Sequence, residues 1–175
     1  HVVWTDMRDG QPEIYYSRWF PDFRGWTSDE RVTSVPAVSD SGAIAVDRHD
    51  DVHLVWQDHR NAGGAEVYYR NWSWTGGWSE EVRVSFGEGS DSQCPALAVN
   101  SQRGTVHVVW HDYRGGSAGI YYRERNQDGS WDPSTEDLLL VGNGTGSLWP
   151  AVASEASDVV HVFWTDEREI GRAHV

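Results

Sequence analysis

The chain has a single cysteine, Cys94, among its 175 residues, so it has no internal disulfide framework. No apolar run approaches the length needed to span a bilayer, and no segment repeats apolar residues at the spacing of an amphipathic helix. There is no run of basic residues, and 14 basic against 27 acidic side chains give a formal net charge of −13. Nucleic acid and anionic membranes reward clustered positive charge, so neither is expected as a partner.

The length predicts one domain. Hydrophobic residues make up only 38% of the chain, but 11 Trp and 7 Tyr are present. Large aromatic side chains each bury much area, so a packed core is expected, and the 18 glycines indicate many turns. The chain begins at His1 rather than Met and shows no signal peptide, so we expect a processed or truncated piece.

One short motif containing His, Trp and Asp recurs four times. Its histidines, His1, His53, His107 and His161, are separated by 52, 54 and 54 residues. The copies then share an Asp-x-Arg step and, in three of them, a Tyr-Tyr pair, a Gly-Trp turn and a small-apolar run, in the same order. Chance does not produce so long a shared order, so the chain is built from repeats of about 50 residues.

The repeats predict strands rather than helices. Segments 52–57, 66–71 and 81–85 are short runs rich in β-branched or aromatic residues, bounded by Gly, Asp, Asn and Ser. Four such strands in about 50 residues are typical of a β-propeller blade. We therefore predict an all-β fold, a β-propeller of four-stranded antiparallel blades, with small-apolar strands innermost and bulky Trp and Tyr further out. The predicted units of this single domain, 1–175, are residues 1–38, 39–91, 92–146 and 147–175, the first and last incomplete.

The predicted strands number three, four, four and two in successive units, which makes about three and a quarter blades. Closed propellers typically have four to eight blades, so this chain alone cannot close a ring. We expect a fragment of a longer chain that supplies further blades. The alternative is self-association, with two chains giving six blades and the overhang from Val160 onward available for swapping. An unpaired blade edge favours association in either case.

The turns between third and fourth strands carry a family resemblance. Segment Asn126–Trp131 (NQDGSW) has Asp128, Gly129 and Trp131, and segment 21–26 (PDFRGW) keeps the same three residue types at another spacing. These turns resemble the Asp-box, or bacterial neuraminidase repeat, of sialidase-like propellers, whose pattern is Ser-x-Asp-x-Gly-x-x-Trp. The resemblance implies a propeller fold, an extracellular or cell-surface location and an association with glycans. In that family the box is a folding device, and the Phe/Tyr-Arg-Ile-Pro motif of its catalytic site is missing here, so we carry over no catalytic residue.

Residues that recur in every unit are expected to serve the repeat, because a binding site is usually one place. We predict packed, hydrogen-bonded histidines, tryptophans that pack blade against blade, and Asp-x-Arg pairs that fix a turn. A zinc site is disfavoured, because zinc needs ligands within about 2.1 Å and equivalent positions in successive blades lie apart. A ring of charge binding an anion or Ca²⁺ is the alternative for the Asp-x-Arg pairs. The recurring residues are His1, Trp4, Asp6, Arg8, His53, Trp56, Asp58, Arg60, His107, Trp110, Asp112, Arg114, His161, Trp164, Asp166 and Arg168.

Function is expected where the units differ. The loops from second to third strand and from fourth to first strand should share one face, and the residues that break the repeat there are His59, Asn61, Glu88, Asp91, His111, Tyr113 and Trp149. Aromatic rings beside carboxylates predict a groove that holds sugars, with ordinary loop variation as the alternative. A pair drawn from Glu88, Asp91 and Asp112 for glycoside hydrolysis is a further alternative. His111 is the sharpest departure, because the other units have Thr or Gln there.

The predicted function is an exported, non-catalytic propeller scaffold that presents its loops to a glycan or a protein. The alternatives are a fragment of a sialidase-like glycoside hydrolase and a purely structural repeat without a ligand. No cofactor is expected. The acidic turn Asp47–Asp51 is compatible with weak Ca²⁺ binding, although a solvated turn is favoured.

Overall fold

The computed structural model of the chain describes residues 1–87, 91–114, 116–141, 146–157 and 159–166. Throughout these ranges the regular structure is β-strand. The same ranges contain no helix long and apolar enough to cross a membrane. Two residues singled out from the sequence, Glu88 and Arg168, lie outside the described residues.

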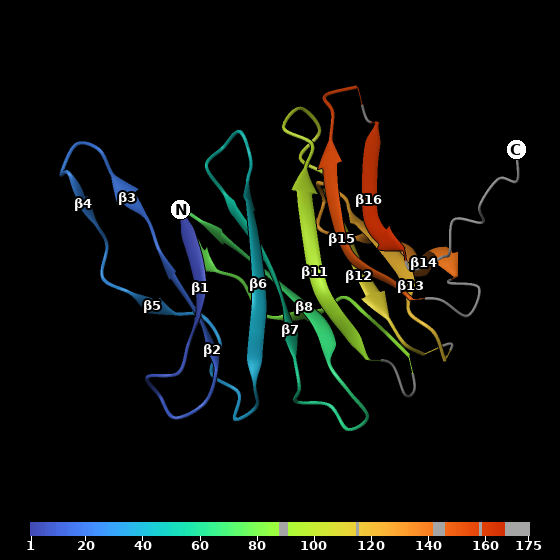
Figure 1. The fold of residues 1–175 in the computed structure, drawn as a ribbon. Coiled ribbons are helices and arrows are strands. Elements are labelled where there is room, and N and C mark those ends of the chain that lie inside the picture. The colour runs from blue at the N-terminus through green and yellow to red at the C-terminus, as the bar shows by residue number, and fades with distance from the viewer. Residues whose placement is uncertain (88–90, 115, 142–145, 158, 167–175) are drawn as a thin grey trace, which may run out of the picture.

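The strands form four main antiparallel sheets that follow one another along the chain (Figure 1). Sheet 1 contains β1 (Val2–Asp6), β2 (Glu13–Ser17) and β5 (Glu30–Arg31), beside a small hairpin of β3 (Trp19–Phe20) and β4 (Gly25–Trp26). Sheet 2 contains β6 (Ser39–Val46), β7 (Val52–Asp58), β8 (Glu66–Ser73) and an outer edge in two pieces, β9 (Gly77–Trp78) and β10 (Val82–Arg83). Sheet 3 contains β11 (Ser92–Val99), β12 (Val106–Asp112), β13 (Gly119–Arg125) and β14 (Trp131–Val141). Sheet 4 contains β15 (Ser147–Ser154) and β16 (Val160–Asp166).

These sheets are the blades of a β-propeller. The first strands of the repeat, β6, β11 and β15, lie side by side, and the remaining strands of each sheet extend away from them (Figure 1). Alanines at alternate positions, such as Ala43 and Ala45 of β6, keep these inner strands thin where one blade contacts the next. The predicted fold class, with blades of three, four, four and two strands, is confirmed, and we call the sheets blades 1 to 4.

The assembly has two faces. We call one the turn face, because it carries the turns 47–51 and 100–105 that join inner strands to second strands, and the end of β15, at the top of Figure 1. We call the other the loop face; it carries the starts of the inner strands and the loops between second and third strands, at the bottom of Figure 1. The predicted candidate residues other than Glu88 belong to the loop face.

The cores lie between blades. Leu54 and Trp56 of blade 2 pack with Ile14 and Tyr16 of blade 1. The opposite side of blade 2 packs on blade 3 through a second cluster, which includes Val55, Tyr69, Leu97, Val108 and Trp110. Each such side chain contributes about 1.5–3 kcal/mol on full burial, so contact with a neighbouring blade is the main stabilising term. This explains why β7 and β12, flanked by blades on both sides, are buried at every position.

The strand histidines are joined to the second tyrosine of each Tyr-Tyr pair. The Nδ1 atoms of His1, His53 and His107 lie 2.6, 2.7 and 2.9 Å from the hydroxyls of Tyr16, Tyr69 and Tyr122, and each pair of rings is stacked. The link joins the second strand to the third strand in three successive blades. In blade 4, which has no third strand within the described residues, His161 Nε2 instead lies 2.7 Å from Glu155 Oε1.

The Asp-x-Arg step forms a second repeated unit with the tryptophan and the first tyrosine. In blade 2 the Trp56 indole donates to Asp58 at 3.1 Å, and both the backbone N–H and the guanidinium of Arg60 donate to the same carboxylate. The Tyr68 ring lies between Trp56, with which it stacks, and the Arg60 guanidinium, 4.2 Å from its centroid. Blades 1 and 3 repeat the stack, although the Trp110 indole N–H of blade 3 is buried and makes no hydrogen bond to a described residue.

The two outer blades expose side chains whose counterparts in blade 2 are buried or partly buried. Trp72 and Trp78 of blade 2 face blade 1, and Trp78 meets the Tyr16 ring edge-on at 5.2 Å. Their counterparts Trp19 and Trp26 in blade 1 are exposed, as is Phe163 in blade 4. These residues occupy positions that elsewhere form the seam with a neighbouring blade, so both ends of the described stack present blade-packing surfaces.

We predict that replacing Asp58 with alanine strongly destabilises the fold. The change leaves the Arg60 guanidinium, the Trp56 indole and the Ser39 hydroxyl without their shared acceptor. Removing one partner from a buried ion pair costs about 3–5 kcal/mol. Urea unfolding of the two variants measures the effect, with Asp6→Ala as the matched control, because its partner Arg8 is half exposed. Equal losses in the two variants would contradict the account.

The same aspartates predict an acid-sensitive fold. Burial alone raises the pKa of Asp58 and Asp112, but hydrogen bonds from Arg60, Trp56, Arg114 and Ser92 outweigh it and hold both below the ordinary 3.8. Their contribution to stability is therefore present above about pH 4 and is lost as pH falls through the lowered folded-state values. The urea concentration at the unfolding midpoint should decrease as the pH is lowered below about 4. This decrease should be less steep in the double variant Asp58→Asn/Asp112→Asn. An unchanged slope in that variant would show that other carboxylates control acid unfolding.

Candidate functional site

The loop face is shaped by a bulge at the start of each inner strand. Ser41, Cys94 and Trp149 occupy the same position in β6, β11 and β15 and have φ of 52°, 50° and 50°. The strand register shifts at each of these points. A left-handed conformation is uncommon in non-glycine residues, and its repetition in three blades shows that the bulge belongs to the repeat. The bulge shifts the start of each inner strand relative to the second strand of the same blade, and this shift sets the direction of the side chains at that point.

A link between blades 2 and 3 runs through this bulge. Gln57 at the end of β7 accepts a hydrogen bond from the backbone N–H of Cys94 at 3.0 Å. Asp40 lies opposite Gln57 across the β6–β7 pair, and its Oδ1 is buried and accepts no hydrogen bond from a described residue. Burial, with a further contribution from the Asp40 charge, raises the pKa of the Cys94 thiol. Asp40, Gln57 and Cys94 therefore form one polar group at the seam.

His111 occupies the position of Gln57 in the next blade. It lies opposite Gln93 across the β11–β12 pair, and Gln93 Nε2 donates to Asp91 Oδ2 at 2.8 Å. Asp91 also accepts from the backbone N–H of Ala65 in blade 2, at 3.1 Å, which holds its carboxylate at the blade seam. The His111 ring is buried, its Nδ1 has no hydrogen-bond partner among the described residues, and its ring meets that of Tyr113 edge-on at 5.6 Å.

The environment of His111 sets its charge. Burial lowers its pKa below 6.5, while the charges of Asp91 and Asp112 oppose the shift without cancelling it. The imidazole is therefore neutral at pH 7 and offers one donor and one acceptor.

The other predicted candidates have different settings. His59 is exposed in the loop after β7, and Asn61 donates to the Tyr68 hydroxyl at 3.0 Å, so Asn61 belongs to the Trp–Tyr–Arg stack. Trp149 is 62% exposed at the bulge of β15, on the strand that packs beside β12. Asp112 is fully buried and bound by Ser92 and Arg114. The hypothesis that Asp112 supplies a carboxylate for hydrolysis is therefore not supported by its geometry, and Glu88 lies outside the described residues.

Sequence reasoning missed Asp40 and Gln93. The search for departures from the repeat covered the loops and the end of the second strand but not the second residue of each inner strand. That residue is Asp40, Gln93 and Leu148 in successive units, and this variation was the signal. The buried pairs of Glu13 and Glu66 with Arg31 and Arg83 were also missed, but they lie within the repeat.

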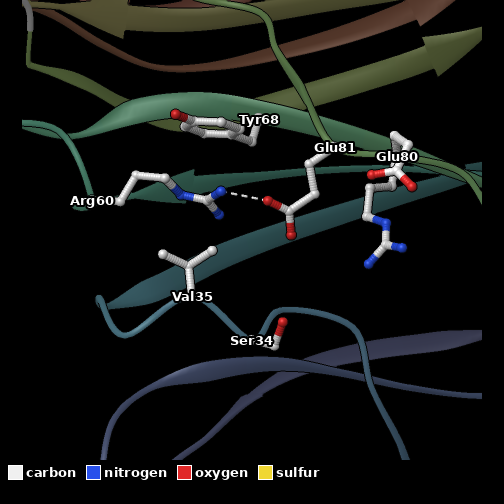
Figure 2. A pocket seen from close by; sticks show the side chains of 7 residues that line it. Ser34, Val35, Arg60, Tyr68, Glu80 and Glu81 are labelled. Carbon is white, nitrogen blue, oxygen red and sulfur yellow. Dashed lines mark hydrogen bonds and ion pairs between the residues drawn. The ribbon is translucent and has the colours of Figure 1, made fainter.

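A cavity of about 350 Å³ at the seam of blades 1 and 2 is shown in Figure 2. Arg60 and Glu81 point toward one another across it and form an ion pair, and Arg70 donates to the backbone carbonyl of Val32 at 2.7 Å. The Tyr68 ring beside it is covered by Trp56 on one face and by Arg60 on the other, so no ring face is available for stacking on a sugar. We interpret this cavity as part of the blade seam.

The arrangement of the described side chains does not indicate a metal site. Across the described residues, no group of three or more His, Cys, Asp or Glu side chains is arranged to hold an ion. In the turn Asp47–Asp51, one oxygen of Asp47 already accepts from the backbone N–H groups of His49 and Asp51.

Comparisons with known proteins support the fold. No protein-family model matches the sequence, and no curated protein matches it. The structure is similar to an endo-arabinase from Bacteroides thetaiotaomicron, with a TM-score of 0.57 and 13% identity, covering 93% of this chain and 64% of that one. It is also similar to a thermostable family-43 glycoside hydrolase, with a TM-score of 0.52 and 9% identity, covering 94% and 65%. At these identities the likeness shows the β-propeller fold alone, and this chain spans just under two thirds of the length of either neighbour.

We predict that His111 titrates below pH 6.5 and that Asp91→Asn lowers its pKa further, because the Asp91 charge opposes the effect of burial. A pH titration of the His111 ring resonances by NMR measures both values. Gln93→Glu is the opposite control: a second negative charge beside the ring should raise the pKa. An upward shift in Asp91→Asn would contradict the proximity of the two groups.

Proposed function

We propose that this chain is part of a carbohydrate-active β-propeller of the glycoside hydrolase type, with the glycan bound on the loop face. The observation that carries the proposal is that Asp40, Asp91 and neutral His111 all lie on the loop face, the face that also carries exposed Tyr113 and Trp149. The fold likeness to two glycoside hydrolases supports this reading over a non-catalytic scaffold.

The chemistry of these groups suits sugars. Carboxylates accept hydrogen bonds from sugar hydroxyls, and a neutral imidazole both donates and accepts. Exposed aromatic rings such as Tyr113 and Trp149 stack on the apolar face of a pyranose or furanose ring. All 14 basic side chains of the chain other than histidine are arginines, and Arg8, Arg60 and Arg114 are held in the aromatic stacks of the repeat. This favours a neutral glycan over an anionic one.

Hydrolysis requires two carboxyl groups that flank the scissile bond. In the proposal Asp40 and Asp91 supply this pair, in place of the pairs with Glu88 or Asp112 considered from the sequence. Asp40 lies in the inner strand β6, and its buried Oδ1 has no hydrogen-bond partner in the described part of the chain. Asp91 is anchored by Ala65 and Gln93, which leaves its orientation fixed.

The remaining features belong to the same proposal. The protein acts outside the cell or at its surface, and the ring is completed by further blades of a longer chain or by a second copy. A sialoside is included among the substrates to be tested, because a sialidase-type activity is one of the alternatives.

The proposal predicts turnover of a neutral glycan that depends on Asp40 and Asp91. Purified protein is assayed against aryl glycosides of arabinose, xylose, galactose and sialic acid, and against arabinan. Asp40→Asn and Asp91→Asn should each lower kcat by about 10²–10⁴-fold, the usual contribution of a positioned acid or base. Glu80→Gln, at the seam of blades 1 and 2, is the matched control and should retain full activity.

Three outcomes overturn the proposal. Binding to a glycan array without turnover would establish the non-catalytic scaffold instead. Silence in both assays would favour a purely structural repeat. Turnover that survives both aspartate substitutions would place the carboxylates elsewhere.

A further inference from the structure

The repeat histidines differ in how their second ring nitrogen is used. In three of the four copies an oxygen lies close to Nε2: Asp50 Oδ1 at 3.4 Å from His1, Thr105 Oγ1 at 3.4 Å from His107, and Glu155 Oε1 at 2.7 Å from His161. His53 is the exception. Its Nε2 is buried without a hydrogen-bond partner, and the nearest carboxylate, Asp47 Oδ2, is 3.8 Å away, too far for a hydrogen bond.

The difference has a simple cause in the sequence. Asp47 and Glu155 occupy the same position, the first residue after the inner strand, and each donates its backbone N–H across the turn to the residue before the second strand. Glu155 is one methylene longer than Asp47, and its carboxylate reaches the histidine of its own blade. The shorter Asp47 leaves a gap between carboxylate and imidazole.

The protonation of His53 determines which hydrogen bonds a group in that gap can make. Burial lowers the pKa of His53 to about 4, against the opposing charge of Asp47, so the ring is neutral at pH 7. Burial also raises the pKa of Tyr69, so its hydroxyl stays protonated, and it lies 2.7 Å from His53 Nδ1. Because the other ring nitrogen faces the Asp47 carboxylate, which can only accept, we assign the Tyr69 hydroxyl as the donor to Nδ1. The ring proton is therefore assigned to Nε2, which points a donor toward the Asp47 carboxylate acceptor.

A cavity of about 240 Å³ adjoins this gap on the turn face, between blades 2 and 3. Its volume is several times that of one water molecule, about 30 Å³, and below that of pockets for drug-sized ligands. Besides His53, its wall includes Asp47, Asp51, Arg48 and Arg125. Two carboxylates and two guanidiniums cancel in formal charge, so the cavity offers many donors and acceptors without a net charge.

The wall is pre-formed on the blade 3 side. Arg125 lies over the Tyr69 ring at 5.2 Å and makes no ion pair with a described residue, so its guanidinium keeps donors for a ligand. Gln127 lies across from Gly104, whose φ of +71° and absent side chain leave room for the Gln127 stem.

We propose that this cavity, which we call the turn-face pocket, binds one neutral sugar unit, with a ligand hydroxyl bridging His53 Nε2 and Asp47 Oδ2. A hydroxyl is the group that fits the gap, because it accepts from the imidazole and donates to the carboxylate at once. The net neutrality of the wall favours an uncharged polyhydroxy ligand over a sugar acid or an amine. The pocket is on the face opposite to Asp40, Asp91 and His111, so the two sites are independent.

The test is calorimetric and NMR titration of the purified protein with methyl glycosides of arabinose, xylose, galactose and glucose. We expect saturable binding of at least one of them, with Kd on the order of 1 mM, and a shift of the His53 ring resonances. Oligosaccharides ending in the same unit form a second arm: tighter binding of these identifies a glycan chain end, and equal binding identifies a free monosaccharide.

Asp47→Glu is the decisive variant, because the repeat itself shows that a glutamate there reaches the histidine. It should weaken binding at least tenfold without lowering the unfolding temperature, since the new carboxylate satisfies Nε2 internally. Gln127→Ala should weaken binding through loss of a wall group, and Asp50→Asn, in the same turn but outside the pocket wall, should bind as the unchanged protein does. Failure of all sugars to bind, or unchanged binding by Asp47→Glu, would overturn the proposal. Loop-face turnover is measured in the same samples, so failure of one site is distinguishable from failure of the other.

Discussion

The aspartate at the end of the second strand, fully buried in blades 2 and 3, is the constraint on which the blades depend. In blades 2 and 3 its carboxylate is fully buried and accepts from an inner-strand serine and from the backbone and guanidinium of the arginine two residues on. A buried charge of this kind is tolerated only when paired and hydrogen-bonded. Once paired, it fixes the turn and holds the guanidinium over the first tyrosine, and in blades 1 and 2 it also accepts from the tryptophan that stacks on that ring. One carboxylate thus joins three strands of a blade.

The repeated unit explains why function is expected where the copies differ. Most polar groups of the Trp–Tyr–Arg stacks and of the His–Tyr links are occupied by one another, and a His–Tyr link uses only Nδ1 of the histidine. Departures from the repeat leave polar atoms without internal partners. Asp40 and His111 do so on the loop face, and His53 does so on the turn face through the shorter Asp47. Polar atoms left without internal partners therefore mark two candidate sites, one on each face of the stack of blades.

Much of the fold was predictable, because the period of the His-Trp-Asp motif specifies the blade and Gly, Ala and aromatic patterns specify its strands. The packing role of Trp56 and the hydrogen bonding of His53 also followed from their recurrence. The sites were less predictable. His111 and Asp91 were found as departures from the repeat, but Asp40 was not, because its strand was regarded only as an inner packing strand. Asn61 was predicted to belong to the site, although its side chain donates a hydrogen bond to the Tyr68 hydroxyl of the repeated stack. The gap at His53 depends on one methylene and on burial across a blade seam, which spacing alone does not encode.

A crystal structure of the protein with a bound neutral oligosaccharide tests the central claim most directly, namely that ligands bind where the repeat is broken. The account predicts sugar rings on the loop face, with hydroxyls within hydrogen-bonding distance of Asp40 or Asp91 and a ring stacked on Tyr113 or Trp149. Sugar bound instead against the repeated Asp58–Arg60 or Asp112–Arg114 stacks, with the loop-face groups untouched, would contradict it.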